Sequence, residues 1–289
     1  MFEGAYTAIV TPFTARGEVD YDALARLIER QIEGGIDGLV PVGTTGESPT
    51  LTMEEHERVV ATTIEVCRGR AQVIAGTGGN STSEALELTQ HAQELGADAT
   101  LQVTPYYNKP SQRGLIAHFS KIADLGLPVV LYNVPGRSAR EIDIETAVEL
   151  SQHPQIVAIK EAGGSVDRVS HLNRRCPELD VLSGDDALTF PMMAVGAVGV
   201  ISVAANVTPA LVTRLVHYVL DGQWDEAAEL HRTLHPLFCD LFLDTNPVPV
   251  KAAMAMQGLL EEVYRLPMVP MAAKQRTQLE ACLRALELI

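Results

Sequence analysis

Basic residues are scarce in this sequence, and their scarcity limits what the protein can bind. The 289 residues include 22 Lys and Arg against 37 Asp and Glu, which gives a formal net charge of -15. A surface of that sign repels nucleic-acid phosphates and anionic lipids. We therefore expect neither a nucleic-acid partner nor a membrane partner. The hydrophobic share of 46% is enough for a core and argues against disorder.

Cysteine is also sparse, and the few cysteines predict no metal site. They lie far apart and form no C-x-x-C pair or zinc-ligand cluster: Cys67, Cys176, Cys239 and Cys282. We expect reduced, packed thiols in a cytoplasmic protein. The N-terminal segment carries Glu3 and no basic or long apolar stretch, so no secretion signal is predicted. An uncharged stretch at 187–213 is broken by glycines and prolines, which favours a buried helix and a buried strand over a membrane span.

Short apolar, β-branched runs alternate with segments of helical period over the first three quarters of the chain. Strict alternation is missing from the runs, as in parallel strands that are buried on both faces. The eight runs are Tyr6–Val10, Gly38–Val42, Gln72–Ala75, Ala99–Val103, Pro128–Tyr132, Ile156–Lys160, Asp180–Ser183 and Val198–Val203. Eight such units predict an α/β fold, a closed (β/α)₈ barrel, which typically takes ~250 residues. The alternative, a doubly wound open sheet, usually carries a glycine-rich turn after its first strand, and Thr11-Pro12-Phe13 stands there instead.

The strand pattern stops after Asp221. Three helices are predicted beyond it: Trp224–Leu243, Val248–Leu260 and Met271–Leu288, with Asn246 or Thr245 as the cap of the second. We therefore predict a catalytic barrel at 1–222 and a C-terminal helical appendage at 223–289.

One of only five lysines ends the sixth apolar run, which reads IVAIK from Ile156 to Lys160. If Lys160 points into the barrel, strand alternation places Ala158 and Ile156 inward as well. Burial would lower the pKa of the lysine below its usual ~10.4, and a neutral amine is a nucleophile toward ketones. The alternative is a structural lysine that pairs with Glu161 or with an aspartate.

Other run ends carry the further groups that a Schiff-base reaction needs. The second run leads into GTTGE at 43–47, where two hydroxyls and the backbone N–H groups of the turn can bind a carboxylate. The fifth run ends in Tyr132, which can relay protons, and Arg137 can grip a second carboxylate. Each has a plainer interpretation: a helix-capping turn, a core tyrosine and a surface arginine. The loop after the fourth run holds Tyr106 and Tyr107, and paired loop aromatics are frequent at interfaces.

Seven motifs follow one another along the chain: GTTGES at 43–48, AGTG at 75–78, VTPYYNKP at 103–110, LYNVPGR at 131–137, IKEA at 159–162, SGDD at 183–186 and NPVPVK at 246–251. On these motifs the sequence resembles the dihydrodipicolinate synthase branch of the pyruvate-dependent, Schiff-base-forming lyase and aldolase family. The resemblance covers essentially the whole chain and implies the barrel with C-terminal helices. It also identifies Lys160 as the Schiff-base lysine.

The resemblance implies an enzyme that condenses pyruvate with L-aspartate semialdehyde to 4-hydroxy-tetrahydrodipicolinate. This is the first committed step towards diaminopimelate and lysine. Neither a metal nor an organic cofactor is implied. A homo-oligomer is implied, in which a dimer is the minimal active unit and two dimers usually form a tetramer.

The resemblance also implies the roles of individual residues. Lys160 forms the imine with pyruvate and Tyr132 passes protons. Thr44 links Tyr132 to Tyr107, which comes from the neighbouring subunit. The remaining implied groups bind substrate: Thr45 and the backbone near Ile201 for the pyruvate carboxylate, Gly184 in the pocket wall, and Arg137 for the semialdehyde carboxylate.

Lysine inhibits many members of this family at a site between two subunits. The positions that match this site are Ser48, His56, Asn80, Glu84 and Tyr106. Pro49 and Met53 do not match, because lysine-sensitive bacterial members tend to carry a small residue and a histidine there. We therefore expect weak lysine feedback or none.

Two departures from the family pattern leave the aldehyde substrate open: Gly163-Gly164 after IKEA, and Ser138-Ala139-Arg140 after Arg137. One alternative is a related pyruvate-dependent aldolase or lyase that acts on a sugar acid or hydroxy-oxo acid. Another is an inactive paralogue that serves as a binding module. Lys251 is a second candidate nucleophile, although the prolines before it favour the start of a helix.

Overall fold

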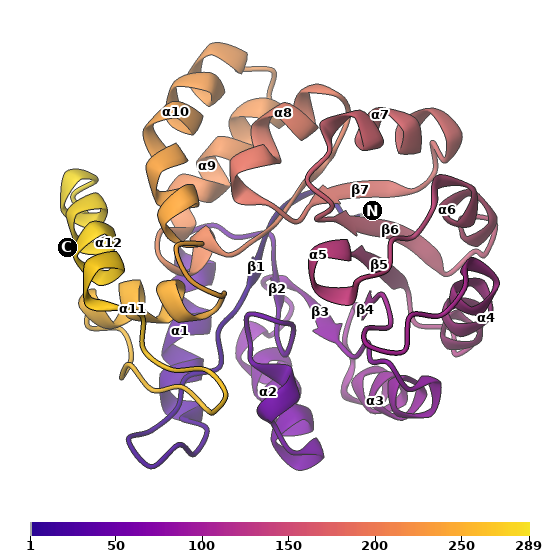
Figure 1. Ribbon diagram of the computed structural model, residues 1–289, viewed down its shortest axis with the longest axis horizontal. Coiled ribbons are helices and arrows are strands. Elements are labelled where there is room, and N and C mark those ends of the chain that lie inside the picture. The colour runs from indigo at the N-terminus through magenta and orange to yellow at the C-terminus, as the bar shows by residue number, and fades with distance from the viewer. Residues whose placement is uncertain (1) are drawn as a thin grey trace.

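The computed structural model describes residues 2–289 and contains a closed barrel of eight parallel strands in sequential order (Figure 1). The strands are β1 (Gly4–Ala8), β2 (Gly38–Val40), β3 (Gln72–Gly76), β4 (Ala99–Val103), β5 (Val129–Asn133), β6 (Ile156–Glu161), β7 (Asp180–Ser183) and β8 (Gly199–Ser202). Each overlaps one of the predicted runs, so the predicted fold class is confirmed. The first strand begins and ends two residues early, and its predicted end, Ile9 and Val10, lies buried beyond the strand.

Helices surround the barrel and pack their apolar faces against it, as expected for parallel strands. They are α1 (Tyr21–Glu33), α2 (Met53–Cys67), α3 (Thr82–Leu95), α4 (Gln112–Ala123), the short α5 (Pro135–Ser138), α6 (Ile144–Leu150), α7 (Val166–Arg175), α8 (Thr189–Ala194) and α9 (Pro209–Leu220). Short 3₁₀ turns are η1 (Ser48–Thr50), η2 (Asp186–Leu188) and η3 (Ala204–Asn206). The uncharged stretch folds as the predicted buried helix and strand, α8 and β8. Within residues 2–289, no helix is long and apolar enough to cross a membrane.

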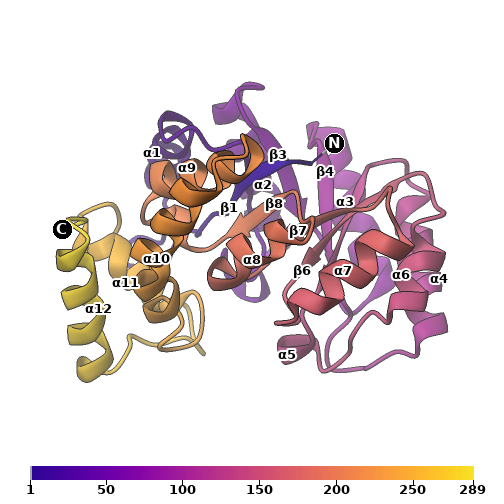
Figure 2. The same ribbon diagram turned by 90° about the horizontal axis from the view of Figure 1, so that it is seen from above.

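The chain ends in α10 (Trp224–Asp240), α11 (Val248–Met256) and α12 (Ala273–Ala285), each shorter than predicted. Figures 1 and 2 both place them together at one side of the barrel, away from α4. The helix α11 ends before Gly258, whose φ of 73° is typical of a residue that follows a helix. The helix α10 packs against α9 and η2, so the C-terminal helices are in contact with the barrel. The division of the chain into two domains at residue 222 stays a prediction.

The predicted cap of α11 is wrong. The N-cap residue is Pro247 and no side chain caps the helix. The Asn246 side chain instead donates a hydrogen bond from Nδ2 to Thr45 Oγ1 at 3.0 Å. A contact across 201 residues of sequence thus replaces the expected local one.

Alternation in β6 is also broken where simple periodicity predicted it to hold. In the pairing of β5 with β6, Val129 faces Ile156 but Val130 faces Ala158, so β6 contains one extra residue. Such a bulge reverses the faces of the residues before it. Ala158 therefore points into the barrel as predicted, whereas Ile156 packs outward in the core between sheet and helices.

Candidate active site

Lys160 and Tyr132 lie side by side inside the barrel. They are partners in the register of β5 and β6. The Lys160 Nζ atom lies 4.4 Å from the centroid of the Tyr132 ring, and both residues are 6% exposed. The amine and the phenol ring are therefore neighbours on the inner face of the barrel.

A glycine in the SGDD segment makes room for the lysine. A Cβ atom at Gly184 would lie 2.7 Å from Ala162 Cβ, 3.0 Å from Lys160 Cε and 3.1 Å from Lys160 Cγ. These distances are shorter than ordinary contacts, so a side chain at this position would push on both Ala162 and Lys160. Gly184 therefore occupies a position in the cavity wall that favours a residue without a side chain.

Lys160 lines a cavity of about 400 Å³ at the carboxyl ends of the strands. We call it the Lys160 cavity. Its walls come from the barrel and from the C-terminal segment: Thr45, Tyr132, Val134, Arg137, Lys160, Ala162, Gly184, Asp185, Ala187, Val203, Phe238, Cys239, Phe242 and Asn246. Five of the predicted site residues thus meet here. Ile201 lies deeper, in the fully buried cluster of the barrel interior that also contains Tyr132.

Asn246 joins two of the predicted substrate-binding residues. Its side chain donates to Thr45, and its backbone oxygen accepts a hydrogen bond from Arg137 Nη2 at 3.3 Å. Asn246 is 5% exposed, and its Oδ1 atom has no hydrogen-bond partner within residues 2–289. From the sequence, Asn246 is part of the NPVPVK motif and is expected only to cap a helix.

A second cavity, the Thr44 cavity, adjoins the first and shares Tyr132, Val134 and Arg137 with it. Its walls also include Val42, Gly43, Thr44, Ser48, Pro49, Gly76, Gly78, Leu101, Val103, Tyr106 and Ser138. Thr44 and Tyr132 thus line one cavity, as the implied proton relay requires.

Tyr107 lies apart from both cavities. It is 91% exposed and has a φ of 71°, which is unusual for a residue other than glycine. The two residues that follow Tyr107 hold the loop in place: Asn108 Nδ2 donates to Asn80 O, and Lys109 O accepts a hydrogen bond from Arg140 Nη2. In its own chain Tyr107 therefore does not reach Thr44.

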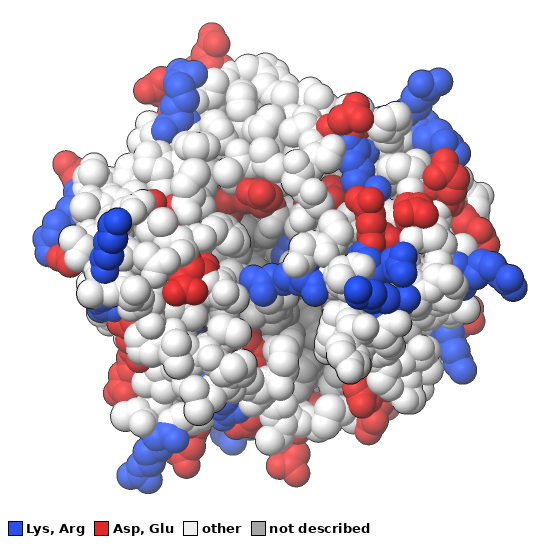
Figure 3. All heavy atoms as spheres, in the orientation of Figure 1, with Lys and Arg blue, Asp and Glu red and all other residues white. Residues whose placement is uncertain are grey.

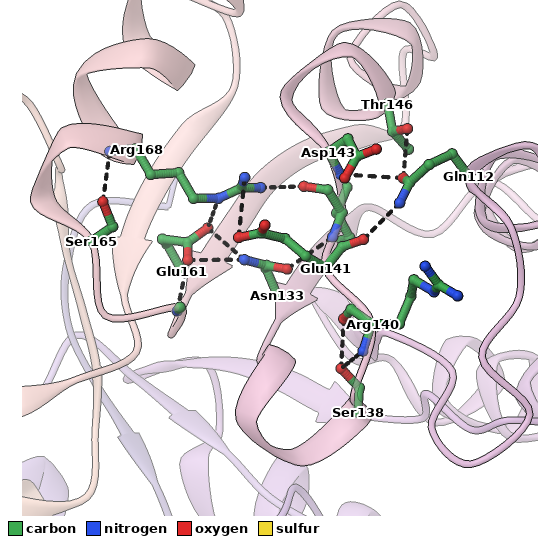
Figure 4. A network of polar contacts seen from close by, with 12 residues as sticks. Gln112, Asn133, Ser138, Arg140, Glu141, Asp143, Thr146, Glu161, Ser165 and Arg168 are labelled. Carbon is green, nitrogen blue, oxygen red and sulfur yellow. Dashed lines mark hydrogen bonds and ion pairs between the residues drawn. The ribbon is translucent and has the colours of Figure 1, made fainter.

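A polar network anchors the outward face of β5 and β6 behind Tyr132 and Lys160 (Figure 4). Asn133 Nδ2 donates to both carboxylate oxygens of Glu161, at 2.9 and 3.0 Å, and Arg168 Nε donates to Glu161 Oε2 at 2.8 Å. Arg168 also donates to the backbone oxygen of Ile142. Glu161 is fully buried and has these partners, so Lys160 does not pair with it as the plainer interpretation proposed.

The same network accounts for a departure from the family pattern. The Gly163 N–H donates to Glu161 Oε1 at 2.7 Å, and a Cβ at Gly163 would lie 2.6 Å from that oxygen. Gly164 follows with a φ of 78°. The two glycines thus fold the chain back onto the buried carboxylate.

Asp186 supports the opposite wall of the Lys160 cavity and was not singled out from the sequence. Its carboxylate accepts hydrogen bonds from the backbone N–H groups of Val203 and Ala204 and from Ser202 Oγ. Burial raises the pKa of Asp186, and these three donors act against that rise. The bonds fix the end of β8 next to Ile201.

Only some of the residues that match the lysine site lie together in one cavity. Ser48 and Tyr106 line the Thr44 cavity together with Pro49. His56 is buried with its Nε2 2.9 Å from Gly76 O, and burial lowers its pKa. Asn80 is half-buried and Glu84 is exposed at the start of α3.

The face seen in Figure 3 is hollowed near its centre, and Lys and Arg side chains reach the rim of the hollow among scattered carboxylates. No group of three or more metal-ligating side chains is found within residues 2–289. The four cysteines are free, but Cys239 is exposed at the Lys160 cavity and is not the packed thiol that we predicted.

Comparison with known proteins agrees with this geometry. The model of the "Dihydrodipicolinate synthetase family" matches residues 1–286. A 4-hydroxy-tetrahydrodipicolinate synthase from Aquifex aeolicus is 50% identical over 98% of this chain and 97% of its own. The solved 4-hydroxy-tetrahydrodipicolinate synthase from Methylacidiphilum fumariolicum SolV is 52% identical, with a TM-score of 0.98 over 99% of this chain and 96% of that one. The dihydrodipicolinate synthase from Acinetobacter baumannii, solved with pyruvate, is 43% identical with a TM-score of 0.98 over 100% of both chains. With its fold, its motifs and its full length all matched, this chain belongs to the dihydrodipicolinate synthetase family.

Proposed function

We propose that the protein condenses pyruvate with L-aspartate semialdehyde to 4-hydroxy-tetrahydrodipicolinate through a Schiff base on Lys160. The observation that carries the proposal is the position of Lys160 Nζ, 4.4 Å from the Tyr132 ring in a cavity that also presents Thr45 and Arg137. An amine, a phenol and two carboxylate-binding groups are what this reaction needs. Full-length relatives carry the same activity in their names.

The first half of the reaction builds the enamine. Lys160 Nζ attacks the C2 carbonyl of pyruvate, and water leaves as the imine forms. The Tyr132 hydroxyl supplies a proton to the departing oxygen. The protonated imine then acts as an electron sink, so C3 loses a proton and becomes the nucleophile.

The second half joins the aldehyde and releases the enzyme. C3 of the enamine attacks the aldehyde carbon, while Arg137 holds the semialdehyde carboxylate. The substrate's amino group then attacks the imine carbon and closes the ring as Lys160 Nζ leaves. Thr45 and the backbone near Ile201 hold the pyruvate carboxylate throughout, because its charge does not change.

Borohydride trapping tests this proposal. We expect pyruvate followed by borohydride to give one adduct per chain, confined by peptide mass spectrometry to Lys160. Lys160→Ala removes the adduct, whereas Arg137→Ala keeps it and impairs chiefly the use of the semialdehyde. A folded wild-type protein without an adduct would favour the inactive paralogue. An adduct with preference for a sugar-acid aldehyde would favour the related lyase.

The proposed relay requires two subunits. Tyr107 is exposed on its own chain, so we propose that it enters the partner's site and meets Thr44 there, with a dimer as the minimal active unit. We further propose that two dimers form a tetramer. The cytoplasm, where free thiols stay reduced, is the compartment proposed for the reaction.

A further inference from the structure

Lys251, the second candidate nucleophile, lies outside both cavities in a buried ion pair. Its Nζ atom donates to Glu47 Oε1 at 2.6 Å and to Thr11 O at 3.1 Å. Lys251 is fully buried and Glu47 is 3% exposed. The pair joins α11 in the C-terminal segment to the end of the GTTGE turn in the barrel.

Glu47 closes the turn that carries Thr44 and Thr45. Its N–H donates to Thr44 O at 3.1 Å, and the Gly46 N–H donates to Gly43 O at 3.1 Å. Glu47 has a φ of 55°. A residue other than glycine keeps such a conformation only where its surroundings impose it, and such residues cluster at functional sites.

The surroundings that impose this conformation come from the C-terminal segment. Besides Lys251, the Arg265 N–H donates to Glu47 Oε2 at 3.3 Å. The Lys251 ammonium also lies 4.2 Å from the centroid of Phe13. Five residues before Lys251, Asn246 donates to Thr45 Oγ1. The segment 246–251 therefore holds the turn at Thr45 and at Glu47.

A buried ion pair is weak support for stability, because desolvation of both charges opposes their attraction. Its stronger effect is on geometry, because each buried charged group is stable only in a conformation that keeps the hydrogen bond to its partner. The Lys251–Glu47 pair therefore restricts the conformation of the turn that carries Thr44 and Thr45.

We propose that Lys251 is a positioning residue, which acts through Glu47 to hold Thr44 and Thr45 for pyruvate binding and proton relay. This inference rests on the proposed function. Lys251 does not touch the substrate, and the nucleophile remains Lys160. The C-terminal helices are thereby part of the catalytic unit, although the proposed nucleophile and proton relay lie in the barrel.

Substitutions of the pair test the inference on the full-length protein. Lys251→Met removes the charge with little change of shape, and Glu47→Gln keeps an acceptor for the lysine. Gln257→Met is the matched control, because Gln257 follows α11 and contacts Val207 O in the barrel but does not touch the turn. Each variant is measured for pyruvate KM, kcat, trapped adduct at saturating pyruvate, and thermal unfolding.

We expect Lys251→Met to raise the pyruvate KM by about tenfold or more and to lower kcat, with full labelling of Lys160 at saturating pyruvate. Glu47→Gln should show a smaller rise, because the hydrogen bond survives. Gln257→Met should stay within about twofold of the wild-type KM. A folded Lys251→Met variant with the KM of the control would overturn the inference.

The double variant Glu47→Gln/Lys251→Met separates positioning from stability, because it leaves no unpaired charge and is expected to fold even where Lys251→Met does not. Positioning predicts a raised KM in this variant despite near wild-type unfolding. Recovery of the wild-type KM would assign the pair to stability alone and overturn the inference. Failure of the wild-type protein to trap pyruvate would instead overturn the proposed function, so the two failures are distinguishable.

Discussion

Asn133 and Glu161 form a buried side-chain contact directly behind Tyr132 and Lys160. Asn133 donates to both oxygens of the Glu161 carboxylate, and these two residues face each other one position beyond Tyr132 and Lys160 in the register of β5 and β6. Successive residues of a strand point to opposite faces. The contact on the outer face therefore fixes how the phenol and the amine meet on the inner face.

We expect Asn133→Leu to destabilise the protein by about 1–3 kcal/mol, because a buried carboxylate loses two donated hydrogen bonds. The imine should also form more slowly, since the register that brings Tyr132 to Lys160 is loosened. Thermal unfolding and the rate of pyruvate trapping measure the two effects. Glu29→Gln, which removes the exposed partner of Arg70, is the control and should change neither. Wild-type trapping in Asn133→Leu would contradict the role of the contact.

Gly184→Ala should reduce trapping at Lys160 without unfolding the protein. The new methyl group would lie 2.7 Å from Ala162 Cβ and 3.0 Å from Lys160 Cε, and the flexible lysine side chain is expected to yield, which moves the amine away from the Tyr132 ring. Gly79→Ala is a matched control, because the nearest atoms to its Cβ lie at 4.0 Å. The pyruvate adduct per chain, counted by intact mass, decides the matter. Equal labelling of both variants would show that the lysine adapts.

Mixed dimers test whether Tyr107 acts across the subunit interface. Tyr107→Phe and Lys160→Ala should each lower turnover when alone. Refolded together, they should recover about a quarter of wild-type activity, because half the dimers are mixed and each holds one intact site. Turnover of the mixture is compared with the sum of the separate variants. No gain above that sum would place Tyr107 in its own subunit or outside the mechanism.

Lysine should inhibit this enzyme weakly or not at all. Pro49 lines the Thr44 cavity and Met53 is 41% exposed at the start of α2, and these are the two positions at which the sequence departs from the expected lysine site. A lysine titration of the initial rate is the measurement. Strong inhibition at micromolar lysine would refute the expectation.

Acid should weaken the protein through His118. Burial lowers the pKa of His118 to about 4 from an ordinary 6.5, with Thr82 Oγ1 2.9 Å from its Nδ1. Between about pH 6.5 and pH 4, this histidine is therefore protonated in the unfolded chain and neutral in the folded chain. This contribution is complete above pH 6.5 and is lost as the pH falls. Its loss from pH 7.5 to pH 5 is about 2 kcal/mol.

Denaturant unfolding at the two pH values, on wild type and on His118→Gln, isolates that loss. Glutamine carries no titrating proton at this site, so the variant should lose less stability in acid than the wild type by the stated amount. Parallel pH profiles for the two proteins would show that another group is responsible.

Several features of the fold and of the site followed from sequence. Eight apolar runs with helical segments between them predict the barrel, because parallel strands buried on both faces leave that pattern. Because the active sites of such barrels lie at the carboxyl ends of the strands, the ends of the runs then indicate Lys160, Tyr132 and the GTTGE turn. Local patterns failed where distant residues compete. The bulge that turns Ile156 outward depends on the pairing of β6 with β5, and the side chain of Asn246 reaches Thr45 although a local cap was expected.

The sequence by itself predicted the class of fold and placed Lys160 at the end of a strand, because hydrophobic period and residue chemistry are local properties. The resemblance of its ordered motifs to a known family then singled out Lys160 as the expected nucleophile. The tertiary structure alone decided which groups meet. It placed Lys251 on Glu47 across 204 residues, gave Glu161 its buried partners and left Tyr107 exposed. Those outcomes depend on closing the barrel and packing the C-terminal helices against it, and such long-range contacts leave no periodic trace in the chain.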